Sequence, residues 1–356
     1  MSQEINSLLD IIVEKNASDL HLHVDKPPTM RVNNQLVEMG KKPLTPEDTV
    51  SYMKAIASAE QQAEVEKVGG TDFGYAFGDK ARFRVSIYRQ KGNINLAMRL
   101  IPYQFLTFEE LGLDKQIKEL CRRPRGLILV TGPTGSGKTT TLATMIDYIN
   151  CERDSHIITV EDPIEYYHTH KKSIVSQREL GSDVPSFPEA LRRGLRQDPD
   201  VFLVGELRDL DTISAAITAA ETGHLVLGTL HTTGAVRTVD RIIDVFPVDQ
   251  QEQIRIMLSV SIIAVISQQL LARADGKGRV AAFEIMVATP AIANLIREKK
   301  TYRILSELQT GTKYGMITMD ESLMRLYSSG IISYDILLES AYDPEQIHLQ
   351  LGEKRK

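Results

Sequence analysis

The segment from Gly132 to Thr139 constrains this chain more than any other. It fits G-x-x-x-x-G-K-[ST], the phosphate-binding loop of nucleoside triphosphatases. Backbone N–H groups must curl around phosphate oxygens, and glycine is needed where a Cβ would block that approach. Lys138 would bring positive charge to the β- and γ-phosphates, and Thr139 would offer an oxygen to Mg²⁺.

The flanks of the loop agree with this interpretation. The apolar run 127–130 predicts a buried parallel strand before it, and Leu142, Met145, Ile146 and Ile149 recur at helical spacing after it. The alternative, a glycine-rich turn arising by chance, does not account for both flanks. A helix N-terminus would also favour an anion. The residues predicted to bind nucleotide phosphates are Gly132, Pro133, Thr134, Gly135, Ser136, Gly137, Lys138, Thr139 and Thr140.

Composition limits the class of protein. The 356 residues allow two or three domains, and 42 Lys+Arg against 47 Asp+Glu argue against a dedicated nucleic-acid binder. Cys121 and Cys151 form neither a metal cluster nor a disulfide framework, which suits a reduced cytosolic setting. No signal peptide or membrane-spanning run is visible. We expect a cytoplasmic protein without a nucleic-acid partner or a direct membrane span.

The hydrophobic pattern predicts an α+β domain over residues 1–102. Its features are a helical stripe from Ile5 to Ile12, a hairpin turning at Asn33-Asn34, a helix start at Thr45-Pro46, and two later strands. Three further parts follow in the chain. We expect a linker over 103–124, an α/β core with a helix-covered parallel sheet over 125–290, and a helical region over 291–356.

Finer patterns predict elements inside these later parts. A turn at 275–278 would join strands 268–273 and 279–286, and the linker would hold a short helix at 113–120. The run 168–172, rich in His and Lys, predicts a solvated loop. The C-terminal helices expected from spacing and caps cover 291–297, 302–309, 319–328 and 334–340.

Polar residues follow the apolar strands of the predicted core. Glu161 comes directly after one strand, Glu206 follows the next, and His231 follows a third. In open α/β sheets ligands bind outside the carboxyl ends of the strands. One edge would therefore gather a phosphate loop, carboxylates and an imidazole, which are the groups that triphosphate hydrolysis requires.

Several of these side chains have a second interpretation. His224 and His231 bracket an apolar strand, where a histidine can be purely structural. Asp162, which precedes a proline, can simply begin a turn. Arg84 and Arg99 project from strands of the small domain and could reach a neighbouring phosphate, although each could equally be a plain surface arginine. The residue pattern leaves these alternatives open.

A resemblance to a known family rests on five segments. They are Ser18 to Leu22, Gly132 to Thr139, Ile158 to Glu165, Asp198 to Asp209, and Thr222 to Thr232. Together they resemble the secretion ATPase superfamily of type II secretion and type IV pili, over nearly the whole chain. The resemblance implies a RecA-like P-loop NTPase domain preceded by a small PAS-like domain, and a motor that hydrolyses ATP with Mg²⁺.

Within the superfamily the chain is most similar to the retraction ATPases of type IV pili, which drive twitching motility. The longer extension and type II secretion ATPases carry an extra N-terminal domain and usually a four-cysteine zinc module. Residues 291–298 resemble the retraction signature but differ at Ala293, and residues 300–304 also depart from it. An accessory retraction ATPase and a type II secretion or pilus assembly ATPase are the alternatives.

The resemblance also implies roles for single residues. Glu161 would be the general base, Glu206 would hold Mg²⁺ through water, and His231, with His224 less directly, would sense the γ-phosphate. Arg84 and Arg99 would be brought onto the nucleotide. All of these residues and Lys138 are carried over by position in the motifs.

The same resemblance implies partners and location. The chain would form a homohexameric ring, meet an inner-membrane platform protein and possibly a paralogous pilus ATPase, and lie peripheral to the inner membrane. Rivals from other classes are a RecA-like nucleic-acid motor and a non-hydrolysing nucleotide switch or GTPase. The absence of an Asn-Lys-x-Asp segment disfavours the GTPase.

Overall fold

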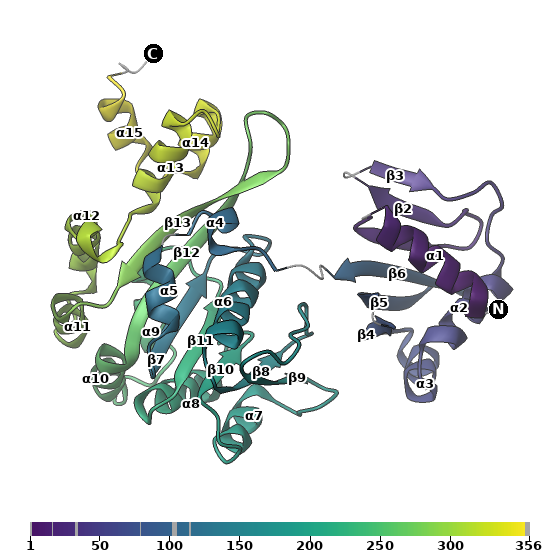
Figure 1. Ribbon diagram of the computed structural model, residues 1–356, viewed down its shortest axis with the longest axis horizontal. Coiled ribbons are helices and arrows are strands. Elements are labelled where there is room, and N and C mark those ends of the chain that lie inside the picture. The colour runs from purple at the N-terminus through teal and green to yellow at the C-terminus, as the bar shows by residue number, and fades with distance from the viewer. Residues whose placement is uncertain are drawn as a thin grey trace. The chain divides into compact units, whose positions relative to one another are not determined.

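The computed structural model describes residues 2–15, 17–32, 35–78, 80–101, 105–113 and 115–352. The chain divides into two compact units (Figure 1). The N-terminal unit comprises residues 1–104 and 163–167, and the C-terminal unit comprises residues 105–162 and 168–356. In the part of the chain described, no helix has the length and apolar character needed to cross a membrane.

The N-terminal unit is built on an antiparallel sheet with the strand order β3-β2-β1-β6-β5-β4. The strands are β1 (Asp19–Leu22), β2 (Thr29–Val32), β3 (Gln35–Glu38), β4 (Gly70–Phe77), β5 (Ala81–Gln90) and β6 (Asn93–Ile101). The helices of this unit are α1 (Ser2–Glu14), α2 (Pro46–Ile56) and α3 (Ala59–Val68).

Local sequence explains how this unit forms. Alternate residues of β5, such as Phe83 and Val85, are buried against apolar residues of α1 and α2, while Arg84 between them is exposed. Thr45 caps α2 in a capping box with Asp48, which confirms the predicted helix start. The predicted hairpin is also confirmed by the pairing of β2 with β3, and its turn at Asn33-Asn34 lies outside the described residues.

The C-terminal unit contains a sheet with the order β13-β12-β7-β11-β10-β8-β9. Neighbouring strands run parallel except β13, which forms an antiparallel hairpin with β12. The strands are β7 (Gly126–Thr131), β8 (His156–Glu161), β9 (Ile174–Glu179), β10 (Val201–Val204), β11 (Leu225–Leu230), β12 (Ile262–Ala272) and β13 (Arg279–Val287).

Helices cover both faces of this sheet and continue past it. Those before and within the sheet are α4 (Phe108–Leu111), α5 (Lys115–Cys121), α6 (Lys138–Glu152), α7 (Phe187–Gly194), α8 (Leu210–Glu221), α9 (Ala235–Asp244) and α10 (Gln251–Ser261). The C-terminal ones are α11 (Pro290–Arg297), η1 (Thr301–Arg303), α12 (Ile304–Thr310), η2 (Thr312–Tyr314), α13 (Met319–Ser328), α14 (Tyr334–Ser340) and α15 (Pro344–Gln350).

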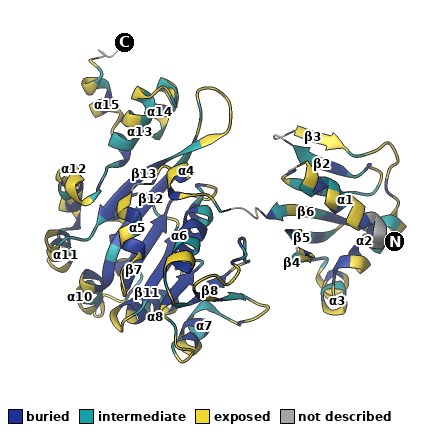
Figure 2. Ribbon diagram, in the orientation of Figure 1, coloured by how far each residue is buried: buried dark blue, intermediate teal, exposed yellow. Residues whose placement is uncertain are grey.

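The strand before the phosphate loop is buried on both faces (Figure 2). Leu127 and Leu129 of β7 join the cluster formed with α8, α9 and α10, whereas Ile128 and Val130 join the cluster formed with α5 and α6. Each such side chain stabilises the fold by about 1.5–3 kcal/mol relative to exposure. This double burial explains the continuous apolar run that predicted the strand.

Some elements differ from the sequence-based expectation. β12 begins at Ile262 rather than residue 268, because α10 ends at Ser261 and passes into the strand without turn residues between them. The predicted helix 302–309 is divided into η1 and α12. His168, predicted in a solvated loop, is only 9% exposed. The helices expected at 319–328 and 334–340 are confirmed as α13 and α14.

Candidate nucleotide site at the carboxyl edge of the sheet

The phosphate loop lies between the end of β7 and the start of α6 at Lys138. Gly132 and Gly137 both have positive φ, at 143° and 89°. A Cβ on Gly132 would collide with the carbonyl of Gln268, and one on Gly137 would lie 2.7 Å from the Gln268 amide nitrogen. The loop therefore needs glycine at these positions both for its backbone conformation and for space.

The interior of the loop fits a phosphate group. The Lys138 Nζ donates hydrogen bonds to the carbonyls of Gly132 at 2.9 Å and Pro133 at 3.0 Å, so its charge lies over the loop. The Ser136 hydroxyl is buried without a hydrogen-bond partner among the described residues. A buried donor without a partner is costly, and a phosphate oxygen in the loop would satisfy it.

The predicted metal-binding oxygens belong to Thr139 and Glu206. Thr139 lies half-buried in the first turn of α6, and the Glu206 side chain is 20% exposed. Hydroxyl and carboxylate oxygens suit Mg²⁺, which commonly keeps several waters and uses few protein ligands. The described residues contain no cluster of three or more His, Cys, Asp or Glu placed to hold a metal.

Gln268 of β12 supports the loop, and sequence reasoning missed it. Its amide nitrogen donates to the Ser136 carbonyl at 2.6 Å, and its amide oxygen accepts from the Thr141 hydroxyl of α6 at 2.8 Å. Gln268 is 2% exposed, so both amide atoms are satisfied inside the protein. The polar run Ser267-Gln268-Gln269 inside a largely apolar strand was the available signal.

Glu206 and His231, which follow neighbouring strands, meet beside the loop. Glu206 Oε1 lies 3.4 Å from His231 Nε2 and 2.5 Å from Arg208 Nε. The hydrogen bond with Glu206 raises the pKa of the Arg208 guanidinium. On its other side, His231 Nδ1 lies 3.5 Å from the Thr134 hydroxyl of the loop. The imidazole thus links the carboxylate after β10 to the phosphate loop after β7.

Glu161 ends β8 at the same edge and is 6% exposed. Its Oε1 accepts hydrogen bonds from the Thr159 hydroxyl at 2.6 Å and from the Gln177 amide at 3.2 Å. The adjacent strand end is close, because Gly205 N donates to Val160 O at 2.8 Å and a Cβ on Gly205 would lie 3.2 Å from Glu161 Cα. The structure therefore brings Glu161 beside the backbone that leads to Glu206.

His224 lies at the amino ends of the parallel strands, opposite the end that carries the phosphate loop. It precedes β11, and its carbonyl accepts from Gly126 N at the start of β7. Its Nδ1 is 3.0 Å from the Ala219 carbonyl, and its ring packs edge-on against Phe202. A six-residue strand spans roughly 20 Å, so the structure does not bring His224 to the phosphate loop of its own chain.

Arg84 and Arg99 belong to the N-terminal unit, where they are register partners on β5 and β6. Both are exposed. Arg99 Nε lies 2.9 Å from Asp19 Oδ1. Partial burial alone would raise the pKa of the Asp19 carboxyl, but hydrogen bonds from Arg99 and Ser18 outweigh it and lower that pKa. Arg99 therefore already has a carboxylate partner.

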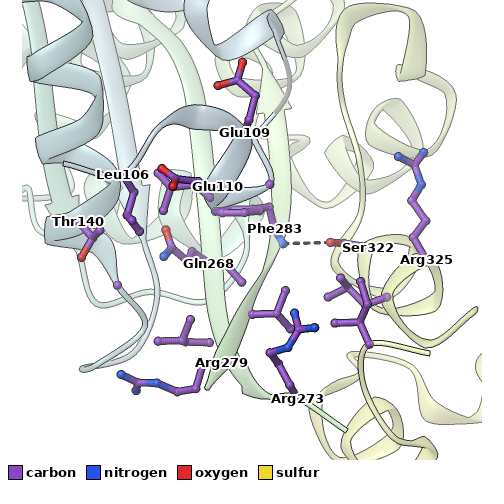
Figure 3. A pocket seen from close by; sticks show the side chains of 18 of the residues that line it. Leu106, Glu109, Glu110, Thr140, Gln268, Arg273, Arg279, Phe283, Ser322 and Arg325 are labelled. Carbon is purple, nitrogen blue, oxygen red and sulfur yellow. Dashed lines mark hydrogen bonds between the residues drawn. The ribbon is translucent and has the colours of Figure 1, made fainter. Parts of the chain in front are cut away.

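A cavity of about 520 Å³ adjoins the loop and the first turn of α6 (Figure 3). Gly137 and Thr140 form part of its wall, together with Gln268. Further lining side chains include Leu106, Glu110, Leu270, Arg273, Arg279 and Phe283. A concave site with apolar walls and a few polar groups is suited to a small molecule, and this one is continuous with the phosphate loop.

The fold and the site together define a P-loop nucleoside triphosphatase with a RecA-like parallel sheet. The chain belongs to the family described as Type II/IV secretion system protein, whose model matches residues 1–330. This confirms the predicted membership of the secretion ATPase superfamily.

The chain is similar to three known members of this family along nearly its whole length. The chain is 48% identical to the Type IV pilus retractation ATPase PilT of Pseudomonas aeruginosa, over 96% of this chain and 99% of that protein. It is 39% identical to the Type IV pilus ATPase PilU of the same organism, over 98% and 91% of the two chains. A crystal structure of the pilus retraction motor PilT with bound ADP superimposes with a TM-score of 0.90 at 46% identity, covering 96% and 98% of the chains. The predicted fold class is confirmed by this similarity.

Proposed function

We propose that this protein is an ATP-hydrolysing motor that powers retraction of type IV pili and thereby twitching motility. The observation that carries the proposal is the meeting of Glu206 and His231 beside the Thr134 end of the phosphate loop. The similarity to PilT over nearly the whole chain supports retraction in particular.

ATP would bind with its phosphates in the loop and its nucleoside in the adjoining cavity. The Lys138 ammonium would neutralise phosphate charge, and the Ser136 hydroxyl would gain a hydrogen-bond partner, which it does not have among the described residues. Thr139, and Glu206 through water, would hold Mg²⁺. When bound, this ion would neutralise charge on the β- and γ-phosphate oxygens.

Four side chains would act at the phosphates of the nucleotide. Glu161, the buried acid after β8, would orient the attacking water and accept its proton. His231 would sense the γ-phosphate, because its ring lies between Glu206 and the phosphate loop. Arg84 and Arg99 would add positive charge to the nucleotide, and His224, which lies away from the phosphate loop of its own chain, would act less directly.

The domain boundaries, the oligomeric state and the partners are part of the same proposal. We assign residues 1–102 to a PAS-like domain, 103–124 to a linker, 125–290 to the RecA-like core and 291–356 to the C-terminal helical region. The protein would work in the cytoplasm as a homohexamer, docked on an inner-membrane platform protein of the pilus machine. A paralogous pilus ATPase would be a second partner.

An accessory retraction ATPase is the second candidate function. It is favoured by the similarity to PilU and by the departures at Ala293 and residues 300–304 from the retraction signature. The greater identity to PilT, 48% against 39%, places the primary motor first.

The experiment for the enzymatic part compares purified wild type with Lys138→Ala. We expect ATP hydrolysis by the wild type and its loss in the variant, because the phosphates lose their main counter-charge. Lys277→Ala, in an exposed turn, is the control. Full activity in Lys138→Ala would contradict the proposal. Competition by GTP for the nucleotide site would favour the switch or GTPase. Stimulation of ATP hydrolysis by single-stranded DNA would favour the nucleic-acid motor.

The cellular part is tested by deleting the gene and imaging pili. Loss of retraction predicts excess pili and lost twitching, restored by the wild-type gene but not by Lys138→Ala. Absence of pili would indicate an assembly motor instead. Excess pili with twitching retained would indicate the accessory role.

A further inference from the structure

We propose that Glu284 is a positioning residue whose buried carboxylate fixes the segment after His231 and joins it to the start of α13, so that the C-terminal helices influence hydrolysis. The proposal rests on the proposed ATPase function. It concerns a side chain that lies on β13, outside the motifs that defined the candidate site.

Glu284 is buried in spite of its charge. Only 4% of the residue is exposed, and this burial raises the pKa of its carboxyl. A buried carboxylate is costly unless hydrogen bonds compensate it. Ala235 N donates to Glu284 Oε1 at 2.7 Å, and the backbone N–H of Met319 also acts against the rise that burial causes in the pKa of this carboxyl.

Ala235 and Met319 are each the first residue of a helix. Ala235 begins α9, and Met319 begins α13. The N-cap of α9 is Gly234, which has no side chain to accept from the first turn, so Glu284 takes over that function from another strand. The positive ends of the two helices also favour a negative charge between them.

The packing around Gly234 explains why a glycine occurs here. Its φ is 85°, and a Cβ would lie 3.3 Å from Glu284 Oε1 and 3.5 Å from the ring of Tyr342. Its N–H donates to the Ser267 hydroxyl at 2.9 Å. Ser267 and Glu284 are register partners on β12 and β13, so two adjacent side chains hold two consecutive amides.

The hydrogen bonds of these two amides hold one end of the segment that carries His231. Gly234 follows His231 by three positions, and the segment between them leaves β11 to enter α9. The Thr238 hydroxyl further donates to Gly234 O at 2.7 Å. With its far end held, the segment presents the imidazole within 3.4 Å of Glu206. A displacement near 1 Å at such a group can cost about 100-fold in rate.

The C-terminal helices reach the same cluster through two residues. The backbone N–H of Met319 in α13 lowers the pKa of Glu284 against the effect of burial, and the side chains of Ser267 and Gln269 likewise act to lower the pKa of Tyr342, which follows α14. Although Tyr342 is 44% exposed, burial around its hydroxyl raises the pKa of the phenol. A cavity of about 590 Å³ lies between these elements and is lined by Glu284, Met319 and Tyr342. Movement of α13 or α14 would therefore act on Glu284 and Ser267.

The test compares Glu284→Ala and Glu284→Gln with Glu321→Gln. Glu321 lines the same cavity but pairs with Arg325 at the surface, so it is a matched control. For Glu284→Ala we expect kcat for ATP to fall at least ~10-fold, with nucleotide affinity within about 3-fold. Glu284→Gln keeps one amide oxygen as acceptor and should be intermediate. The control should match the wild type.

Hydrogen exchange supplies the readout of position. In Glu284→Ala the amides of residues 232–236 and those at the start of α13 should both exchange faster, by about 10-fold for the loss of a hydrogen bond of ~1.4 kcal/mol. Wild-type kcat, or unchanged exchange in either segment, would overturn the proposal. An inactive wild type would instead contradict the proposed function, which separates the two failures.

A milder variant covers the case in which Glu284→Ala does not fold. Tyr342→Phe removes only the hydroxyl on the C-terminal side and leaves Glu284 in place. It should accelerate exchange at residues 232–236 and lower kcat by at least about 2-fold while fluorescent ATP-analogue binding is retained. Exchange and kcat both equal to the wild type would overturn the link to the C-terminal helices.

Discussion

The Oε1 atom of Glu206 lies 3.4 Å from Nε2 of His231. The relationship follows from strand register, because β10 and β11 are parallel neighbours with Val204 opposite Gly228. Residues just past the two strand ends therefore come to the same edge. The Thr134 hydroxyl, 3.5 Å from the other imidazole nitrogen, extends the chain of polar groups to the phosphate loop.

Glu206→Gln should separate binding from turnover. The amide keeps the size of the side chain but removes the charge that lies beside His231 and that would hold Mg²⁺, so nucleotide should still bind while ATP turnover falls at least ~100-fold. Equilibrium binding of a fluorescent ATP analogue and steady-state phosphate release measure the two effects. Asp211→Asn, an exposed acid in α8, is the control. Turnover within about 3-fold of the wild type would remove Glu206 from the proposed mechanism.

Gln268→Ala should loosen the phosphate loop. The substitution leaves the Ser136 carbonyl and the buried Thr141 hydroxyl without their partner and opens a small cavity, which together should lower the free energy of unfolding by about 2 kcal/mol. Nucleotide affinity should fall as well, because the loop is less preorganised. Urea unfolding and nucleotide titration measure both quantities, with the exposed Gln253→Ala as control. An unchanged affinity would show that the loop keeps its shape without this support.

Local patterns predicted the phosphate loop because its residue types are set by backbone geometry within a few positions. The acids and imidazole at Glu161, Glu206 and His231 were also predictable, because parallel strands bring their carboxyl ends to one edge. Gln268 and Glu284 were missed, since their roles depend on where β12 and β13 pack. Their only sequence signal is the presence of polar residues in strands that are mostly apolar.

Other errors have equally specific causes. The run 262–266 is apolar throughout, so its periodicity could not separate the end of a helix from the start of β12. His168 sits among charged residues in the sequence, which predicted a solvated loop, yet its ring stacks on Phe105 with centroids 4.6 Å apart. His224 and His231 lie at the two ends of the same strand, and the direction of β11 puts only His231 at the carboxyl ends of the strands.

Arg84→Ala and Arg99→Ala should impair hydrolysis more than folding. Arg99 has a side chain that is 70% exposed, so its ion pair with Asp19 contributes under about 1 kcal/mol to stability. If the guanidinium groups neutralise charge on the transferring phosphoryl group, each variant should lose at least ~10-fold in kcat/KM for ATP. Arg89→Ala, an exposed arginine on β5, is the control for surface charge. Wild-type kinetics in both variants would mean that Arg84 and Arg99 are ordinary surface residues without a role in hydrolysis.

His168 should make stability fall in mild acid. It is buried, and desolvation lowers the pKa of its imidazole from 6.5 to about 4 in the folded protein. Between these two values the unfolded chain binds a proton that the folded chain does not, so the contribution is complete above pH 6.5 and is lost as pH falls toward 4. The total is on the order of 3 kcal/mol.

His168→Phe removes this titration while keeping a ring to stack on Phe105. We therefore expect the wild type and the variant to differ in the slope of unfolding free energy against pH, with the wild type declining more steeply from pH 6.5 to 4. Carboxylates that titrate in the same range affect both proteins equally, so the difference between the two curves isolates His168. Urea unfolding at several pH values measures it. Parallel curves would mean that the imidazole is solvated and protonates normally in the folded state.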